Sequence, residues 1–482
     1  MTVEVYLFER NGSLGMDSES VTVDVNGESR RVDVPMRAFS KGYYPELVEL
    51  YQGLGIPFAS SSFSFAFGHS PVSQDRIPGP IPEFMYSGLE AIKSSHIRFQ
   101  QPQRSRFGAF CFLLSTLWSY LVMIVAARYY VAFGCTANPN HKISKMTFGD
   151  WLASSWISQS FAETLLIPLF SSIMTADPTV VKSMPAAETL QYINSTFLYN
   201  HFTVQGGVSQ VVRALTNDIP ESHIKLQCMI TDLVPVMQKN GQQQITIQYM
   251  THSSAQSDEI SFDHIVFAAQ GTQTARLLQM YERHLTSLPS SPALTPQLAH
   301  CREQIAHLKR LAYEQSTVVC HTDTSVLSPN KTQWQALNLV SPLNPKGTDP
   351  TYTMATHIVG RFEDMVIMQT TNPLPWLFPE ESKCISQSTF ERFVLTLEGR
   401  KARELFFDRD ATKSRQPMLG ALQGPPGQGH NGVCKSPGIW FCGSWSYGVP
   451  LLEGCVTSAR LVTDRILALE SAEGRQHSAI VM

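Results

Sequence analysis

The chain has 482 residues, 43% of them hydrophobic and 16% charged, and its formal net charge is −3. This length allows two or three domains with cores of their own. No lysine- or arginine-rich block stands out, so nucleic-acid binding has no electrostatic basis. The nine cysteines form neither a Cys-x-x-Cys pair nor a cluster with histidine. They indicate a reduced, intracellular chain without a metal site, and the N-terminus has no signal-peptide pattern.

The first predicted elements follow from short-range signals. Residues 21–25 and 30–34 are expected to be strands, and Asn26-Gly27 between them is a strong hairpin signal. A helix is expected over 45–53, followed by an alternating stretch over 60–67. From there to about residue 200 the pattern is mostly helical, which suits a region that covers a substrate.

An uncharged apolar run of 21 residues, Phe107 to Ala127, lies inside this helical region. Arg104 and Arg106 precede it and Arg128 follows it, so its length and flanks match a membrane-spanning helix. The alternative is a helix that is buried in the protein or dips into one face of a membrane. A single crossing would separate the parts of the chain before and after it. We therefore expect membrane attachment, by one-sided insertion in preference to a span.

Beyond residue 200 the pattern alternates between helix and strand. Gly206-Gly207 leads into a helix that ends near Leu215, and Asn240-Gly241 joins two of the strands that follow. The expected strands cover 224–229, 244–250, 260–268, 316–321, 352–359 and 365–371, and a helix covers 296–311. The last two strands would form the floor of a substrate cavity. The Gly/Pro/Gln loop at 423–433 lacks the Lys-Ser/Thr of a phosphate-binding loop and is expected to be a surface connection.

The segment 438–460 is the most informative part of the chain. Ile439 to Cys442 is a short apolar run typical of a buried strand, Gly443 and Gly448 interrupt it, and Pro450 fits the first turn of a helix. Small residues in that helix let a flat group lie close to the backbone. The start of the helix suits a phosphate or an electron-rich ring edge.

This segment resembles the C-terminal flavin-contacting signature of the FAD-dependent amine oxidase and phytoene desaturase superfamily. The resemblance is closer to its predicted NAD/FAD-binding oxidoreductase branch, found in bacteria and fungi. Residues 3–10 and 13–15 resemble the second strand of a dinucleotide-binding fold, which ends in an acidic residue at the adenosine ribose. Further matches occur in the family's order at 34–37, 42–45, 147–152, 204–208, 262–268 and 319–323.

The resemblance implies an α/β fold. A Rossmann-like FAD domain of the glutathione-reductase type would carry an inserted α+β substrate domain and lack its first βα unit. The FAD-binding parts would cover 1–58, 201–285 and 426–482. The substrate-binding parts would cover 59–200, which includes the apolar helix, and 286–425.

The resemblance also implies which residues contact FAD. These are Glu9, Gly15, Arg37, Ile230, Gly443, Ser444, Glu453 and Gly454. Ser444 stands where many relatives have an aspartate that faces the ribityl or phosphate part. Each residue also has a purely structural interpretation: the glycines as turns, Arg37 and Glu453 as an ion pair, and Ser444 as a loop cap. No catalytic residue is singled out, because the flavin carries the hydride chemistry.

One departure from the family concerns the start of the chain. A full member begins with a strand and Gly-x-Gly-x-x-Gly, whose glycines let the backbone touch the pyrophosphate, and no such motif precedes Glu9. The loss of this unit would remove the phosphate cradle and the packing surface at the centre of the sheet. Either the sequence is truncated or tight FAD binding has been lost. The intact remainder of the pattern favours truncation.

The leading hypothesis is an FAD-dependent oxidoreductase that acts on a hydrophobic small-molecule or lipid-like substrate in association with a membrane. The branch that it resembles implies a role in fungal secondary metabolism. The alternative is a non-catalytic membrane-associated protein that keeps a degenerate flavoprotein scaffold. The missing glycines favour this alternative, and the retained C-terminal signature opposes it. A conventional NAD dehydrogenase ranks third, because the chain has no complete nucleotide fingerprint.

Overall fold

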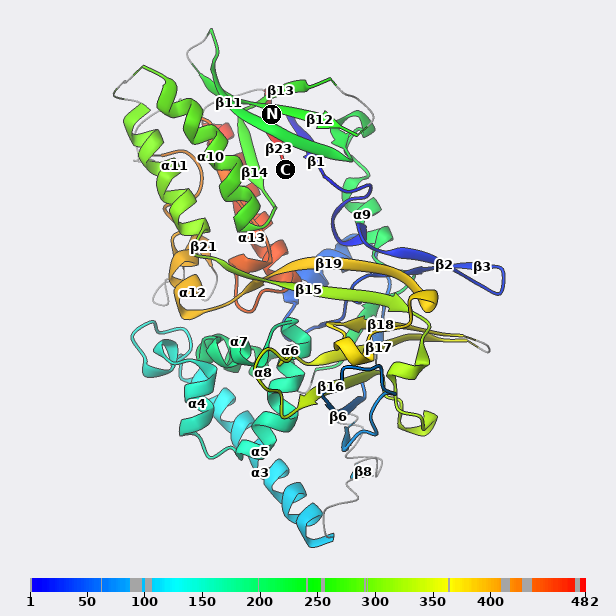
Figure 1. Cartoon of the computed structure of the whole chain (residues 1–482). Helices are drawn as coiled ribbons and strands as arrows, with labels where there is room; N and C mark the ends of the chain where they lie inside the picture. The colour runs from blue at the N-terminus through cyan, green and yellow to red at the C-terminus, as the bar shows by residue number, and fades with distance from the viewer. Residues whose placement is uncertain are drawn as a thin grey trace.

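The computed structural model describes residues 2–61, 63–86, 98–99, 106–197, 199–239, 242–252, 256–289, 292, 294–362, 365–408, 417–426, 436–472 and 477–482. In Figure 1 a parallel sheet and its helices form the upper part, long antiparallel strands cross the middle, and helices form the lower left part. The predicted turn at Asn240-Gly241 and residues 427–433 of the predicted surface loop lie outside the described residues.

A five-stranded parallel sheet contains both ends of the chain. Its strands, in spatial order, are β10 (Ile224–Lys225), β1 (Thr2–Phe8), β23 (His477–Val481), β14 (His264–Phe267) and β22 (Gly438–Phe441). All pairings between them are parallel. The order corresponds to positions 3-2-1-4-5 of a dinucleotide-binding sheet. The N-terminal strand β1 therefore lies where the second strand of such a sheet belongs, as the sequence predicts.

The centre of this sheet is formed by the last strand of the chain, β23. It pairs with Thr2 to Tyr6 of β1 on one side and with the start of β14 on the other. Val481 in this strand is only 2% exposed. The expectation that the sheet lacks packing surface at its centre is therefore wrong, because apolar residues of β23 supply it. The sequence did not reveal this, since a five-residue strand with only three apolar residues, Ala479 to Val481, does not specify its neighbours.

Three long helices and a small antiparallel sheet pack around the parallel sheet. The helices are α10 (Gly271–Ser287), α11 (Leu294–Leu308) and α13 (Leu452–Ala472), and the sheet consists of β11 (Cys228–Met237), β12 (Gln243–Thr251) and β13 (Asp258–Phe262). The single strand predicted over 260–268 is in fact two, β13 and β14. Asp263 separates them, and its carboxylate accepts hydrogen bonds from Gln244 and from the backbone of Ala479 in β23.

A mostly antiparallel eight-stranded sheet forms the second half of the molecule. In spatial order it contains β19 (Cys384–Val394), β15 (Ala312–His321), β18 (Val366–Thr371), β17 (Met354–Arg361), β16 (Leu337–Leu343), β6 (Phe65–Pro71), β7 (Phe84–Tyr86) and β8 (Arg98–Phe99). The strands predicted over 316–321, 352–359 and 365–371 correspond to β15, β17 and β18. The predicted hairpin is β2 (Val21–Val25) and β3 (Glu28–Val32), with positive φ angles at Asn26 and Gly27.

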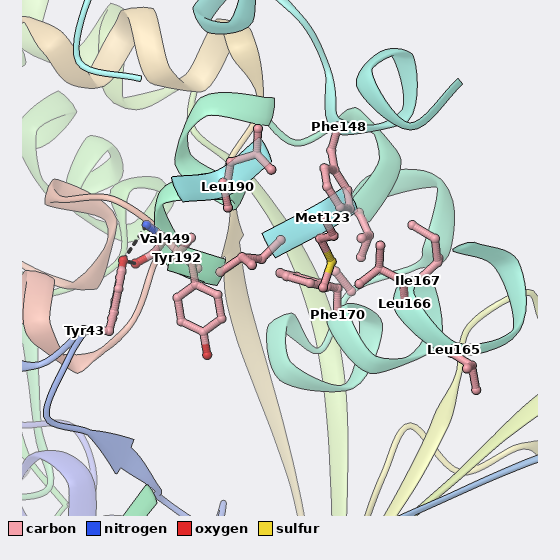
Figure 2. Close-up of a cluster of buried hydrophobic side chains, with 14 of the residues drawn as sticks. Tyr43, Met123, Phe148, Leu165, Leu166, Ile167, Phe170, Leu190, Tyr192 and Val449 are labelled. Atoms are coloured by element: carbon pink, nitrogen blue, oxygen red, sulfur yellow. Dashed lines mark hydrogen bonds between the residues drawn. The ribbon is translucent and has the colours of Figure 1, made fainter. Parts of the chain in front are cut away.

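The helical region packs on α1 (Pro45–Gly53), which begins and ends as predicted. Its longest helix, α3 (Arg106–Ala132), contains the whole predicted apolar helix. The others are α4 (Phe148–Ser154), α5 (Gln159–Phe161), α6 (Ile167–Met174), α7 (Pro178–Ser183) and α8 (Ala186–Thr196). Figure 2 shows part of their shared core, in which Met123 of α3 lies among side chains of α4, α6 and α8.

Shorter elements connect these parts. They are β4 (Phe39–Ser40), β5 (Phe58–Ser61), β9 (His201–Val204), α9 (Ser209–Thr216), α12 (Leu397–Glu404), β20 (Phe407–Asp408) and β21 (Met418–Leu419). The alternating stretch predicted over 60–67 is divided between β5 and β6. The domain boundaries proposed from the sequence stay predictions.

The central position of β23 leads to a stability prediction. Val481→Asp places a charge in the interior of the sheet and should lower the free energy of unfolding by about 3 kcal/mol or more. The matched control is Met482→Asp, because Met482 is adjacent and 39% exposed. Urea unfolding followed by tryptophan fluorescence measures both variants. Equal unfolding midpoints for the two variants would contradict a central, buried β23.

Candidate functional site

The carboxyl edge of the parallel sheet brings together residues from both ends of the sequence. Glu9 follows β1 and Gly443 follows β22, and the two strands run in the same direction with β23 and β14 between them. Three strand spacings separate them, or about 14 Å. Ligands of open parallel sheets bind outside this edge. The two segments that the sequence assigns to one cofactor therefore lie at the edge where a nucleotide would bind.

Glu9 and Ile230 lie at one end of this edge. The Glu9 carboxylate accepts a 2.8 Å hydrogen bond from the backbone N–H of Asn11, and the Glu9 carbonyl accepts one from Cys228, the first residue of β11. Ile230 is two residues further along β11, where the pairing with β12 shifts register. Glu9 is half-buried and Arg10 is exposed, so the acidic side chain turns toward the protein, as the strand pattern predicts.

Gly15 and Arg37 are brought together through Met16, the residue after Gly15. Gly15 has φ +55°, and a Cβ built on it would have no atom within 4 Å, so its backbone conformation favours glycine while close packing does not require it. The carbonyl of Met16 accepts a 3.1 Å hydrogen bond from Nη2 of Arg37. The turn at Gly15 thus positions an acceptor for the buried guanidinium.

Arg37 is a buried cation with a free donor. Burial lowers the pKa of its guanidinium, and the carboxylate of Asp33 opposes that shift. Its Nε is buried and has no hydrogen-bond partner among the described residues, and the same holds for Nε of Arg392 in β19. Burial lowers the pKa of Arg392 to about 10, with the neighbouring charge of Arg37 as a further cause. Two buried guanidiniums with free donors suit an anionic or electron-rich group.

Two polar residues that the sequence did not single out hold the segment that carries Arg37. The amide of Gln369 in β18 accepts the N–H of Met36 at 2.8 Å and also donates to the carbonyl of Asp33 at 2.5 Å. Both carboxylate oxygens of Asp33 accept the N–H of Val208, at 3.0 and 3.2 Å. Burial raises the pKa of the Asp33 carboxyl, and the bond from Val208 opposes that shift. Bonds from the antiparallel sheet and from the loop before α9 therefore hold the backbone segment that precedes Arg37.

The loop between β22 and α13 is held by two residues from outside it. The hydroxyl of Tyr43 donates to the carbonyl of Val449 at 3.0 Å and accepts its N–H at 2.8 Å (Figure 2). The guanidinium of Arg403 in α12 donates to the carbonyl of Gly448 at 2.9 Å. Arg403 also lies 3.6 Å from the carboxylate of Glu188 in α8. These contacts join the loop between β22 and α13 to the helical region through buried side chains.

Gly443 and Ser444 in this loop form one compact unit with Gly454 in the first turn of α13. Gly443 has φ +146° and donates its N–H to the hydroxyl of Ser458 at 3.0 Å. A Cβ on Gly454 would lie 2.7 Å from the carbonyl oxygen of Ser444. The backbone angle of Gly443 and the close approach at Gly454 therefore explain both glycines without a cofactor. Ser444 is half-buried, and its contact with a cofactor stays a prediction.

Glu453 has a structural task that the sequence did not reveal. Its two carboxylate oxygens accept the N–H groups of Glu46 and Leu47, each at 3.0 Å, at the first turn of α1. Tyr44, which precedes this helix, provides no side-chain cap. Burial raises the pKa of the Glu453 carboxyl. No described ion pair joins it to Arg37, so Glu453 caps a helix from 406 residues away.

A neutral histidine faces the Arg37 segment from the antiparallel sheet. His357 of β17 is paired directly with Gln369, so both side chains lie on the same face of the sheet. Its ring stacks on Phe63 at 5.9 Å, and burial lowers its pKa to about 4. Its Nδ1 is buried and has no partner among the described residues. Across all the residues that the structure describes, no group of three or more His, Cys, Asp or Glu side chains could hold a metal ion.

Comparison with known proteins gives a fold relationship. No family model matches the chain, and no curated protein sequence matches it. Among solved structures, the fold is similar to that of cyclohexylamine oxidase from Brevibacterium oxydans IH-35A, with a TM-score of 0.53 and 12% sequence identity. The similarity covers 98% of this chain and 94% of that chain. The chain therefore shares its overall fold with that protein along almost its whole length.

The close approach at Gly454 leads to a second prediction. Gly454→Ala should force the start of α13 away from Ser444 and lower the melting temperature by several degrees. A loss of 1 kcal/mol in the free energy of unfolding lowers the melting temperature by about 4–8 °C in a small domain and by less in a larger one. Gly53→Ala is the matched control, because a Cβ on Gly53 in α1 meets no atom within 4 Å. We expect that control to be neutral or stabilising. Differential scanning calorimetry compares the two. A lower melting temperature for the control than for Gly454→Ala would contradict the packing.

Proposed function

We propose that the protein is an FAD-dependent oxidoreductase that acts on a hydrophobic small-molecule or lipid-like substrate. The observation that carries the proposal is the common sheet edge that joins Glu9 to the loop at Gly443, with the buried guanidinium of Arg37 beside α13. The similarity of the fold to an amine oxidase supports it. The signatures at both ends of the sequence agree with this interpretation.

The chain's residues fit the two ends of an FAD molecule. Glu9, with one carboxylate oxygen bonded to Asn11, has a second oxygen for the adenosine ribose. Ile230 would lie near the adenine. Arg37 and Arg392, with free buried Nε donors, suit the electron-rich part of the flavin or its phosphates. When bound, FAD would accept a hydride from the substrate.

The middle of the cofactor has a poorer fit. In dinucleotide folds a glycine loop contacts the pyrophosphate, and no Gly-x-Gly-x-x-Gly spacing occurs within the residues that the structure describes. A Gly-x-Gly-x-x-Gly spacing does occur at 427–432. It precedes β22 and lies outside the described residues. The expected consequence is weak retention of the cofactor.

On the substrate side, His357 lies close to the Arg37 segment, and its buried Nδ1 has no partner among the described residues. Its low pKa keeps the imidazole neutral at pH 7, so Nδ1 could accept a proton or a hydrogen bond from a substrate. Phe63 stacks on the ring and supplies an apolar neighbour. This combination favours a mostly hydrophobic substrate with one polar group.

The alternative function is a non-catalytic membrane-associated protein that keeps the flavoprotein scaffold. The specific observation in its favour is that Gly454 and Glu453, two of the predicted FAD contacts, have structural roles that need no cofactor. The two functions differ in a simple property. The enzyme must bind FAD, and the scaffold protein does not.

The absence of that glycine spacing from the described residues predicts how the protein behaves on purification. We expect a colourless protein that binds added FAD reversibly. Absorbance spectra of the purified protein, before and after dialysis with excess FAD, measure this. A protein that purifies yellow would show that the glycine loop is dispensable. A folded protein that binds no added FAD would support the scaffold alternative.

The carboxylate of Glu9 predicts the effect of a conservative substitution. A charge-assisted hydrogen bond contributes about 1.5–3 kcal/mol, so Glu9→Gln should weaken FAD affinity roughly ten- to a hundredfold. Arg10→Ala is the matched control, because Arg10 is adjacent and exposed. Quenching of FAD fluorescence on titration with protein gives both dissociation constants. Equal affinity for wild type and Glu9→Gln, in folded protein, would remove Glu9 from the site.

A further inference from the structure

Helix α3 exposes one continuous apolar face to solvent. The exposed side chains recur every three or four residues, and each is between 49% and 76% exposed: Phe107, Phe110, Leu114, Leu117, Trp118, Leu121, Val125 and Tyr129. We call this face the apolar stripe. From Phe107 to Tyr129 it is about 33 Å long, at 1.5 Å per residue. A contiguous apolar patch of this kind marks an interaction site. Figure 1 shows α3 at the lower edge of the molecule, where the helix points away from the parallel sheet.

The opposite face of α3 is buried against the protein. Thr116, Ser119, Met123 and Ala127 are at most 7% exposed. The hydroxyl of Ser119 accepts the N–H of Ser158 at 3.0 Å. By length and composition α3 could cross a membrane. However, its buried face is fixed to the helical region along the middle of the helix. Lipid can therefore reach the stripe but cannot surround the helix.

The charge of the surrounding sequence is complementary to anionic lipid. Residues 91–149 contain no Asp or Glu and seven basic residues, Lys93, Arg98, Arg104, Arg106, Arg128, Lys142 and Lys145. The last three are exposed near the C-terminal end of α3. Basic residues that flank an apolar helix face are attracted to the headgroups of acidic phospholipids. A second copy of the chain would instead bring two positively charged segments together.

Two exposed tryptophans lie beside the same part of α3. Trp118 is 52% exposed within the stripe, and Trp156 is 79% exposed two residues before Ser158, which is bonded to Ser119. Tryptophan is enriched at the boundary between lipid headgroups and acyl chains, because its ring is apolar and its N–H is polar. This placement favours a membrane surface over an apolar protein partner.

We propose that α3 lies in the plane of one leaflet of an anionic membrane. The apolar stripe faces the acyl chains, and Arg128, Lys142 and Lys145 face the headgroups. The inference does not depend on FAD binding. It would give a membrane-dissolved, hydrophobic substrate a short route to the protein, and it makes the attachment one-sided.

Vesicle flotation tests the proposal. Wild-type protein should float with vesicles of phosphatidylcholine that contain phosphatidylserine and bind pure phosphatidylcholine more weakly. The triple variant Leu114→Gln/Leu117→Gln/Leu121→Gln should bind the anionic vesicles at least about tenfold less. The matched control is Met229→Gln/Met237→Gln in β11, where the two side chains are 59% and 67% exposed. It should bind as wild type does.

A second variant separates the charge from the apolar stripe. Arg128→Gln/Lys142→Gln/Lys145→Gln should lower binding to anionic vesicles by about a hundredfold and leave binding to pure phosphatidylcholine unchanged. Circular dichroism confirms that each variant is folded. Unchanged flotation of the folded stripe variant would overturn the proposal. So would a dimer in sedimentation velocity that the same three leucine substitutions dissociate, because the occupant would then be a second copy.

Protease accessibility distinguishes one-sided insertion from a span. A protease site introduced at Asn138-Pro139, in the exposed turn after α3, and an N-terminal epitope tag report on the two flanks of the helix. With protein expressed on sealed microsomes, one-sided insertion predicts cleavage of both from the same side. Protection of one flank and cleavage of the other would establish a span and contradict the proposal.

Discussion

The parallel pairing of β23 between β1 and β14 is the constraint on which the rest of the structure depends. It places the last residues of the chain at the centre of the sheet, bonded along most of β1. Because β23 makes the sheet continuous and all its strands are parallel, the carboxyl ends of β1 and β22 lie at the same edge. Glu9 and the loop at Gly443 could not share a site without it. The same pairing also removes the exposed strand edges that a gap would leave.

The site edge is then rigidified by contacts between distant parts of the sequence. Tyr43 and Arg403 hold the loop after β22, and Gln369 and Asp33 hold the segment before Arg37. Tyr43 joins the loop after β22 to the segment before α1, and Gln369 joins the antiparallel sheet to the segment before Arg37. These bonds fix the backbone around Arg37, whose buried Nε has no partner among the described residues.

Elements with strong local signals could be predicted from the sequence. Asn26-Gly27 specified a hairpin, the pattern over 45–53 specified α1, and the uncharged apolar run specified α3. The common edge of Glu9 and Gly443 followed from family resemblance. Contacts that depend on the tertiary fold could not be predicted. Neither the neighbours of β23 nor the helix cap that Glu453 provides to α1 leaves a local pattern, because the partners are hundreds of residues apart.

The adjacent, parallel arrangement of β1 and β23 has a topological consequence. In most dinucleotide folds the central strand precedes its neighbour and reaches it through a right-handed helical crossover. Here Thr2 lies beside His477 while the N–H of Phe8 bonds to the carbonyl of Met482, so the two neighbouring strands are hundreds of residues apart in the sequence. Their pairing closes a loop that contains most of the chain, and contacts between such distant residues slow folding.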